Sequence, residues 1–159
     1  MTRDEILKQL WKEQDTAFEL MTEYDSLPHY YGSDVLYQAE AYIVHEIGNT
    51  PQITVTELSE KLNKTKSAVS QMVKRLIDKG LVEQARDTEN RRIYHLTLTK
   101  DGEKVYNDHI EFNRVCQKIT FDMLSGFSDQ ELAVHTKVQQ MINKAYQGDV
   151  DRSREKWSE

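Results

Sequence analysis

The most constraining feature of this sequence is a helix start signal followed closely by a tight turn. Thr54 and Glu57 have the spacing of a capping box. The hydrophobic residue just before Thr54 and the one just after Glu57 have the spacing of a hydrophobic staple. These signals predict a short helix that ends near Leu62. The polar pair at 63–64 then forms a turn.

A second helix is predicted directly after this turn. Thr65 is a good N-cap, the hydrophobic pattern continues to about Asp78, and Gly80 stops the helix. Two short helices joined by a tight turn form a helix-turn-helix.

After Gly80 the hydrophobic period changes from helical to alternating. Residues 81–86 and 93–98 have the pattern of two strands, and the polar segment 87–92 between them has the composition of a hairpin tip. A helix-turn-helix followed by a basic-tipped hairpin predicts a winged helix.

The second helix has two faces of opposite character. Its hydrophobic positions share one side, and a set of polar residues that can contact DNA occupies its N-cap and other side: Thr65, Lys66, Ser67, Ser70, Gln71 and Lys74. Glutamine can make a bidentate contact with adenine, and lysine can reach guanine or phosphate. Arginines of the hairpin (Arg86, Arg91 and Arg92) suit the narrow, electronegative minor groove of A·T tracts.

The charge distribution agrees with this interpretation. The chain of 159 residues has a net charge of -6, but residues 54–100 contain ten basic and six acidic side chains. The basic module therefore carries +4 and the remainder -10, so that one face attracts DNA while the rest repels it.

The composition and motifs of the chain argue against other classes of protein. No hydrophobic run approaches the length of a membrane span, and the charged N-terminus lacks the pattern of a signal peptide, so we expect a soluble, cytoplasmic protein. The single cysteine, Cys116, excludes an internal disulfide framework and occupies a hydrophobic seam, where packing is favoured over redox sensing. No phosphate loop, nucleophile elbow or HExxH motif is present, so we expect neither an enzyme nor a cofactor.

Helices flank the winged module on both sides. We expect one at 4–21, one from an N-cap at Ser33 to 47, one at 103–124, and a last one opened by the capping box of Ser128 and Glu131. The third carries a hydrophobic seam that needs a partner helix: Val105, His109, Phe112, Cys116, Ile119 and Met123.

The predicted fold is mainly α with a small β-wing. Its parts are N-terminal helices for dimerisation and a cleft (1–48), a winged helix-turn-helix (49–101), C-terminal dimerisation helices (102–147) and a charged tail (148–159).

Several segments of the chain resemble the MarR family of transcriptional regulators. The resemblance covers about residues 33–146, and its specific part is carried by 58–62, 65–71, 74–76, 79–82, 87–92 and 96–99 with Gly102. It implies an obligate homodimer that binds a pseudo-palindromic operator in double-stranded DNA as a ligand-responsive repressor. Arg92 matches the arginine that enters the minor groove in the family, and Asn90 stands in place of the acid that orients it.

The resemblance also implies a cleft for a small apolar or aromatic acid. His29, Tyr37, Tyr42 and His45 lie where its entry is expected, although aromatic packing against a partner chain is an alternative. A zinc site is disfavoured because Ala41 and Asn113 replace two ligands of the zinc-sensing branch. A winged helix that binds protein instead of DNA is the remaining alternative.

Overall fold

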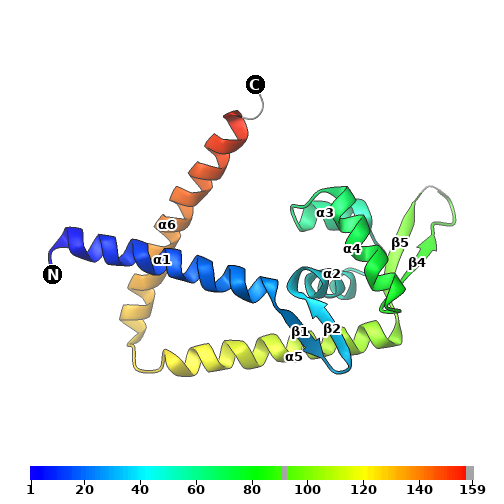
Figure 1. Ribbon diagram of the computed structural model, residues 1–159, viewed down its shortest axis with the longest axis horizontal. Coiled ribbons are helices and arrows are strands. Elements are labelled where there is room, and N and C mark those ends of the chain that lie inside the picture. The colour runs from blue at the N-terminus through cyan, green and yellow to red at the C-terminus, as the bar shows by residue number, and fades with distance from the viewer. Residues whose placement is uncertain (91–92, 157–159) are drawn as a thin grey trace. The chain divides into compact units, whose positions relative to one another are not determined.

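The computed structural model describes residues 1–90 and 93–156, and it confirms a mainly helical chain with a small β-wing (Figure 1). Arg91 and Arg92 at the wing tip lie outside the described residues. The elements in chain order are α1 (Arg3–Ser26), β1 (Pro28–Tyr31), β2 (Asp34–Tyr37), α2 (Gln38–Asn49), β3 (Ile53–Thr54), α3 (Val55–Lys61), α4 (Lys66–Asp78), β4 (Val82–Arg86), β5 (Tyr94–Leu98), α5 (Lys100–Met123) and α6 (Asp129–Lys156). The chain divides into two compact units, 1–113 and 114–159.

The helix-turn-helix forms as predicted, because its ends are fixed by local hydrogen bonds. Thr54 and Glu57 complete the capping box of α3, with the Thr54 N–H donating to the Glu57 carboxylate at 2.8 Å. The Thr65 hydroxyl accepts from the Ala68 N–H and caps α4. Gly80 ends this segment with a φ of 72°, a conformation that a side chain disfavours.

The wing contains one strand more than the sequence predicted. β4 and β5 pair antiparallel, as expected, and the two-residue strand β3 pairs with the outer side of β5. A strand this short has no period of its own, so Ile53 and Thr54 were readable only as the approach to α3.

The predicted helix start at Ser33 is wrong. Residues 28–37 form an antiparallel hairpin instead, and α2 begins at Gln38. Gly32 has a φ of 59° and is the first of the two loop residues, a position at which type II′ turns favour glycine. Ser33 is the second loop residue and therefore cannot cap a helix.

The two outermost helices are longer than predicted. α1 extends to Ser26 and ends where Leu27, the residue before Pro28, adopts an extended backbone. The Ser128 capping box of α6 is confirmed. α6 does not fray at Gly148 but continues to Lys156, and side-chain contacts one turn apart, such as Gln147 to Asp151 at 2.8 Å, support this extension.

The hydrophobic core lies in the unit formed by residues 1–113. Its members come from the hairpin, α2, the winged module and the first turns of α5, and α2 lies between α5 and the pair α3 and α4 (Figure 1). Val105 and His109 of the predicted seam are 1% exposed and belong to this interior, whereas Ile119 is 55% exposed and Met123 is 78% exposed. Only the later part of the seam is therefore available to a partner.

None of the helices in the described ranges 1–90 and 93–156 combines the length and the apolar character that crossing a membrane requires.

Gly102 is required by the close approach of α5 to the segment after α4. A Cβ on Gly102 would lie 2.0 Å from the backbone oxygen of Leu81, whereas a Cβ on Gly126 would meet nothing within 4 Å. We expect Gly102→Ala to lower the free energy of unfolding by about 1–3 kcal/mol or more. Gly126→Ala, the matched control, should change it by less than about 1 kcal/mol. Urea unfolding followed by circular dichroism measures both, and equal midpoints for the two variants would contradict this packing.

Candidate nucleic-acid interface

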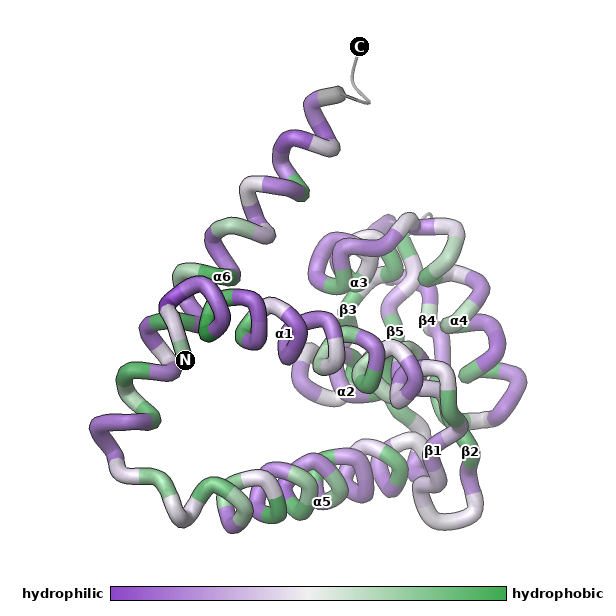
Figure 2. Tube along the Cα trace, turned by 60° about the vertical axis from the view of Figure 1, so that its left-hand side comes forward, coloured by the Kyte–Doolittle hydropathy of each residue, from purple (hydrophilic) through white to green (hydrophobic). Residues whose placement is uncertain are grey.

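The polar face of α4 is exposed along its whole length. Val69, Met72, Val73 and Leu76 are buried on one side of the helix, and the residues predicted to contact DNA are exposed on the other: Lys66, Ser67, Ser70, Gln71 and Lys74. Figure 2 shows the corresponding alternation of hydrophilic and hydrophobic residues along α4. The face thus presents two ammonium groups, two hydroxyls and a carboxamide to solvent.

A buried carboxylate fixes α4 against α2. The Glu40 side chain is 4% exposed and lies 2.9 Å from Arg75 Nε and 3.2 Å from Lys79 Nζ. It also accepts from the Tyr37 N–H at the start of α2, and Lys79 donates to the Val35 carbonyl at 2.8 Å. The last turn of α4 is therefore joined to both the hairpin and α2.

The charges of this cluster compensate for its burial. Burial alone would raise the pKa of Glu40, but hydrogen bonds from Arg75 and Lys79 outweigh it and hold the pKa below its ordinary value. Glu40 is consequently ionised at neutral pH and holds both cations on the side of α4 that faces α2.

Arg86 at the end of β4 is held by its neighbour across the wing. Its Nε donates to the Tyr94 hydroxyl at 2.7 Å, and its guanidinium lies 5.3 Å from the centre of the Tyr94 ring. Of the three wing arginines predicted to bind DNA, Arg86 is exposed at the base of the tip, and Arg91 and Arg92 lie outside the described residues.

His95 braces the wing through two hydrogen bonds that the sequence did not reveal. Its Nδ1 lies 2.6 Å from the Gln52 carbonyl and its Nε2 lies 2.9 Å from the Asp87 carboxylate. Both partners only accept, so His95 makes both bonds only as an imidazolium. The hydrogen bond that His95 donates to Asp87, followed by the one to Gln52, raises the pKa of His95.

Asp87 also organises the start of the wing tip. Its other carboxylate oxygen accepts from the backbone N–H groups of Asn90 at 2.6 Å and of Glu89 at 2.9 Å. The bond from Asn90, then those from His95 and Glu89, hold the pKa of Asp87 below its ordinary value. A single carboxylate therefore ties the wing tip to β5.

A hollow of about 580 Å³ separates α4 from the wing. Lys66 and Ser70 of α4 line it together with Gln84 and Tyr94 of the wing and residues of α3. α4 and the wing thus form the two sides of one concave surface. Gln84 and Tyr94 were missed at the sequence level, because alternation along a strand does not show which face a partner helix approaches.

Three of the four residues predicted to bind an effector, His29, Tyr42 and His45, make ring contacts with residues of α5. Tyr42 and His45 contact the ring of His109, and the His45 ring also contacts Tyr106. His29 is buried, and its Nε2 donates to the Tyr24 carbonyl at 3.1 Å. Tyr37 is 52% exposed before α2.

His109 is the central buried member of this aromatic cluster. Its Nδ1 lies 3.1 Å from the Tyr31 hydroxyl, and its Nε2 lies 3.0 Å from the Asn113 amide. Burial, with a smaller effect of His45 and His29, lowers the pKa of His109 to about 4, so the imidazole is neutral at physiological pH. Within the part of the chain that the structure describes, no three His, Cys, Asp or Glu side chains are grouped to hold a metal ion.

Comparisons with known proteins agree with this architecture. Residues 33–93 match the sequence profile of the MarR family. An uncharacterized HTH-type transcriptional regulator, YhjH, of Bacillus subtilis (strain 168) is 23% identical over 97 residues, which are 61% of this chain and 55% of YhjH. This chain therefore spans little more than half the length of that relative.

Two solved structures share the fold over most of their length. Streptococcus pneumoniae FabT, crystallised in complex with DNA, is 25% identical with a TM-score of 0.68, and the match covers 92% of this chain and 98% of FabT. Lactococcus lactis ZitR, a zinc-responsive MarR family member, is 17% identical with a TM-score of 0.75, covering 89% of this chain and 99% of ZitR. Residues 33–93 thus match the MarR family, and the chain shares its winged-helix fold with these two structures.

Proposed function

We propose that this protein regulates transcription by binding duplex DNA as a homodimer, with α4 in the major groove and the wing beside it. The observation that carries the proposal is the exposed polar face of α4, which shares one concave surface with the wing. Lys, Gln and Ser on one side of a helix are the groups that read base edges. The structure of FabT in complex with DNA, which has the same fold, supports DNA binding.

The positive charge of the module supports contact with phosphate. Glu40 binds Arg75 and Lys79 on the inner side of α4, so these two cations stabilise the fold. Lys66 and Lys74 are exposed on the outer side, where they remain available to DNA.

The proposed partner in the homodimer is a second copy of the same terminal helices. Among residues 114–155 no side chain is buried, although the segment carries large hydrophobic residues such as Phe121, Val134 and Met141. α1 likewise has no buried residue but exposes Trp11 and Phe18. Figure 2 shows hydrophobic positions recurring along both α1 and α6. Hydrophobic faces of this size require a partner, and the family assigns that role to the second chain.

The proposal also assigns a role to each segment of the chain and includes release of DNA on binding a small molecule. The four segments 1–48, 49–101, 102–147 and 148–159 are proposed as dimerisation helices, DNA-binding module, second dimerisation segment and charged tail. Release of DNA by a small apolar or aromatic acid near Tyr42 and His45 is proposed from the aromatic cluster that surrounds His109.

The dimer is tested by placing a charge on the hydrophobic face of α6. Met141 is exposed in the single chain and would be covered in the proposed dimer, so Met141→Asp should raise the dimer dissociation constant on the order of a hundredfold. Gln140→Asp adds the same charge one residue away and serves as the control. Sedimentation at micromolar concentration measures both, and a wild-type protein that is a folded monomer would contradict the proposal.

Readout of bases is tested at Gln71. Gln71→Ala should cost about 1–3 kcal/mol for each lost bidentate contact and relax the preference at one position of each half-site. Arg92→Ala should instead weaken binding most where the flanking sequence is A·T-rich. Competition titrations against half-site and flank variants separate the two effects, with Gln140→Ala as the control. Wild-type binding by both variants would favour a protein-binding winged helix.

The brace at His95 predicts a pH dependence of the wing. Because the pKa of His95 is raised, its contribution to the stability of the wing is complete at low pH. This contribution is lost as the pH rises through the raised pKa. Because the pKa of Asp87 is lowered, the contribution of Asp87 to the stability of the wing is lost only as the pH falls through this lowered pKa. DNA affinity should therefore decline from about pH 6 to about pH 9 in wild type and less in Asp87→Asn. Identical profiles would exclude the brace from DNA binding, and an imidazole NMR titration of His95 checks its pKa directly.

A further inference from the structure

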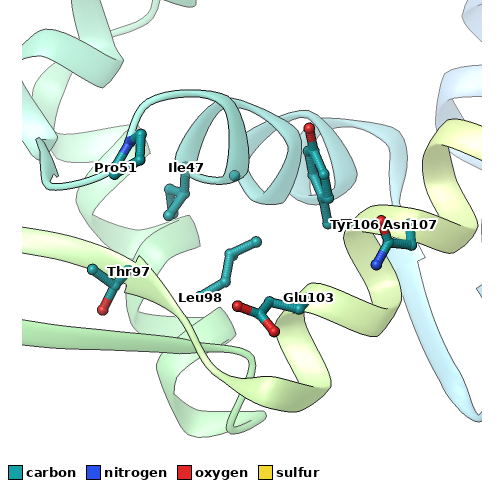
Figure 3. A pocket seen from close by; sticks show the side chains of 8 residues that line it. Ile47, Pro51, Thr97, Leu98, Glu103, Tyr106 and Asn107 are labelled. Carbon is teal, nitrogen blue, oxygen red and sulfur yellow. The ribbon is translucent and has the colours of Figure 1, made fainter.

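A separate hollow of about 400 Å³ lies where the end of α2, the end of β5 and the start of α5 meet (Figure 3). Its walls include Ile47 and Pro51 from α2 and its following turn, Thr97 and Leu98 from β5, and Glu103 and Tyr106 from α5. The volume lies within the range of small-molecule sites. None of the residues predicted to bind an effector lines this hollow.

The aromatic wall of this hollow is held in place by α2. A Cβ on Gly48 would lie 2.5 Å from the Tyr106 ring, so the absence of a side chain there allows the ring to pack on the helix. The Tyr106 hydroxyl donates to Asn49 Oδ1 at 2.7 Å, and the Asn49 amide lies 2.8 Å from His45 Nε2. The hydroxyl is thereby occupied, and Tyr106 offers its ring to a ligand.

The charged group of the hollow is the Glu103 carboxylate. Figure 3 shows it directed toward the space beside Leu98. Glu103 is exposed, and its carboxylate has no ion pair or hydrogen bond to any residue within 1–90 and 93–156. The nearby Lys104 is paired with Asp101 at 2.7 Å. The lining contains no Lys, Arg or His, so its electrostatics disfavour an anion and favour a cation.

We propose that this hollow binds a small organic ammonium ion with an apolar body. The ammonium group pairs with Glu103, and the apolar body packs against Ile47, Leu98 and the Tyr106 ring, since a carboxylate and an aromatic ring both attract an ammonium group. Because the walls come from the wing strand and from α5, occupancy fixes the wing relative to α5. The consequence for DNA binding rests on the function proposed above.

Binding is tested on the ¹⁵N-labelled chain of 159 residues without DNA. The probes are 2-phenylethylamine and 3-phenylpropanoate, which have similar bodies and opposite charges. The amine should shift backbone amide resonances of residues 47–51, 97–98 and 103–107, and the acid should leave them unchanged. Glu103→Gln should weaken amine binding about fivefold, the upper range for an exposed ion pair, and Glu13→Gln, which removes the same charge on α1, should not.

A second variant tests the cavity itself. Asn107→Trp places a large ring on an exposed lining position, so the protein should fold normally and lose the amine-dependent shifts. Equal shifts with both probes, or unchanged amine binding in Glu103→Gln, would overturn the proposal and leave Glu103 as a residue that only stabilises the start of α5.

DNA titrations with and without the amine then separate the two proposals. An amine that binds the hollow and alters DNA affinity in wild type, but not in Asn107→Trp, supports both. An amine that binds a protein unable to bind DNA overturns only the function proposed above. An amine that fails to bind a protein with normal DNA affinity overturns only the present inference.

Discussion

The orientation of the recognition helix depends on one buried carboxylate. Glu40 belongs to α2 but binds Arg75 and Lys79 of α4, and a carboxylate this deeply buried is tolerated only when such partners satisfy it. Removing either cation would take one charge-assisted hydrogen bond from the buried carboxylate, so the contact favours this position of α4. The side of α4 that carries Gln71 and Lys74 is turned to solvent because the opposite side is fixed by the core and its last turn by Glu40.

Local signals explain which elements could be predicted from the sequence. Thr54 and Thr65 cap α3 and α4, and each hydroxyl accepts from the backbone N–H three residues later, which is a spacing that a sequence pattern can show. The hairpin at 28–37 also carried a signal, since a Gly-Ser pair between two runs of β-branched and aromatic residues is typical of a two-residue loop. Ser33 suits a helix cap equally well, and only the pairing of His29 with Leu36 decides between the two.

The candidate site was predictable where it depends on helical periodicity. The exposed face of α4 follows from the spacing of its polar residues. The supports of the site were not predictable, because they join residues far apart in the chain: Arg75 to Glu40 across 35 positions and His95 to Gln52 across 43. Gln52 also has a φ of 65°, which turns its carbonyl toward His95, and no residue preference of glutamine indicates this conformation.

The connection between the wing and α5 links the proposed ligand site to the proposed DNA interface. The Leu81 carbonyl accepts from the Thr99 N–H at 3.1 Å, the Thr99 hydroxyl donates to the Gly80 carbonyl at 2.7 Å, and the Gly102 N–H donates to the same hydroxyl at 3.0 Å. These bonds join the end of α4, the start of β4 and the start of α5 into one unit without a flexible linker. A displacement of α5 by a ligand or a partner therefore moves α4 and the wing together, and the spacing between two such modules is the quantity that a palindromic DNA site would measure.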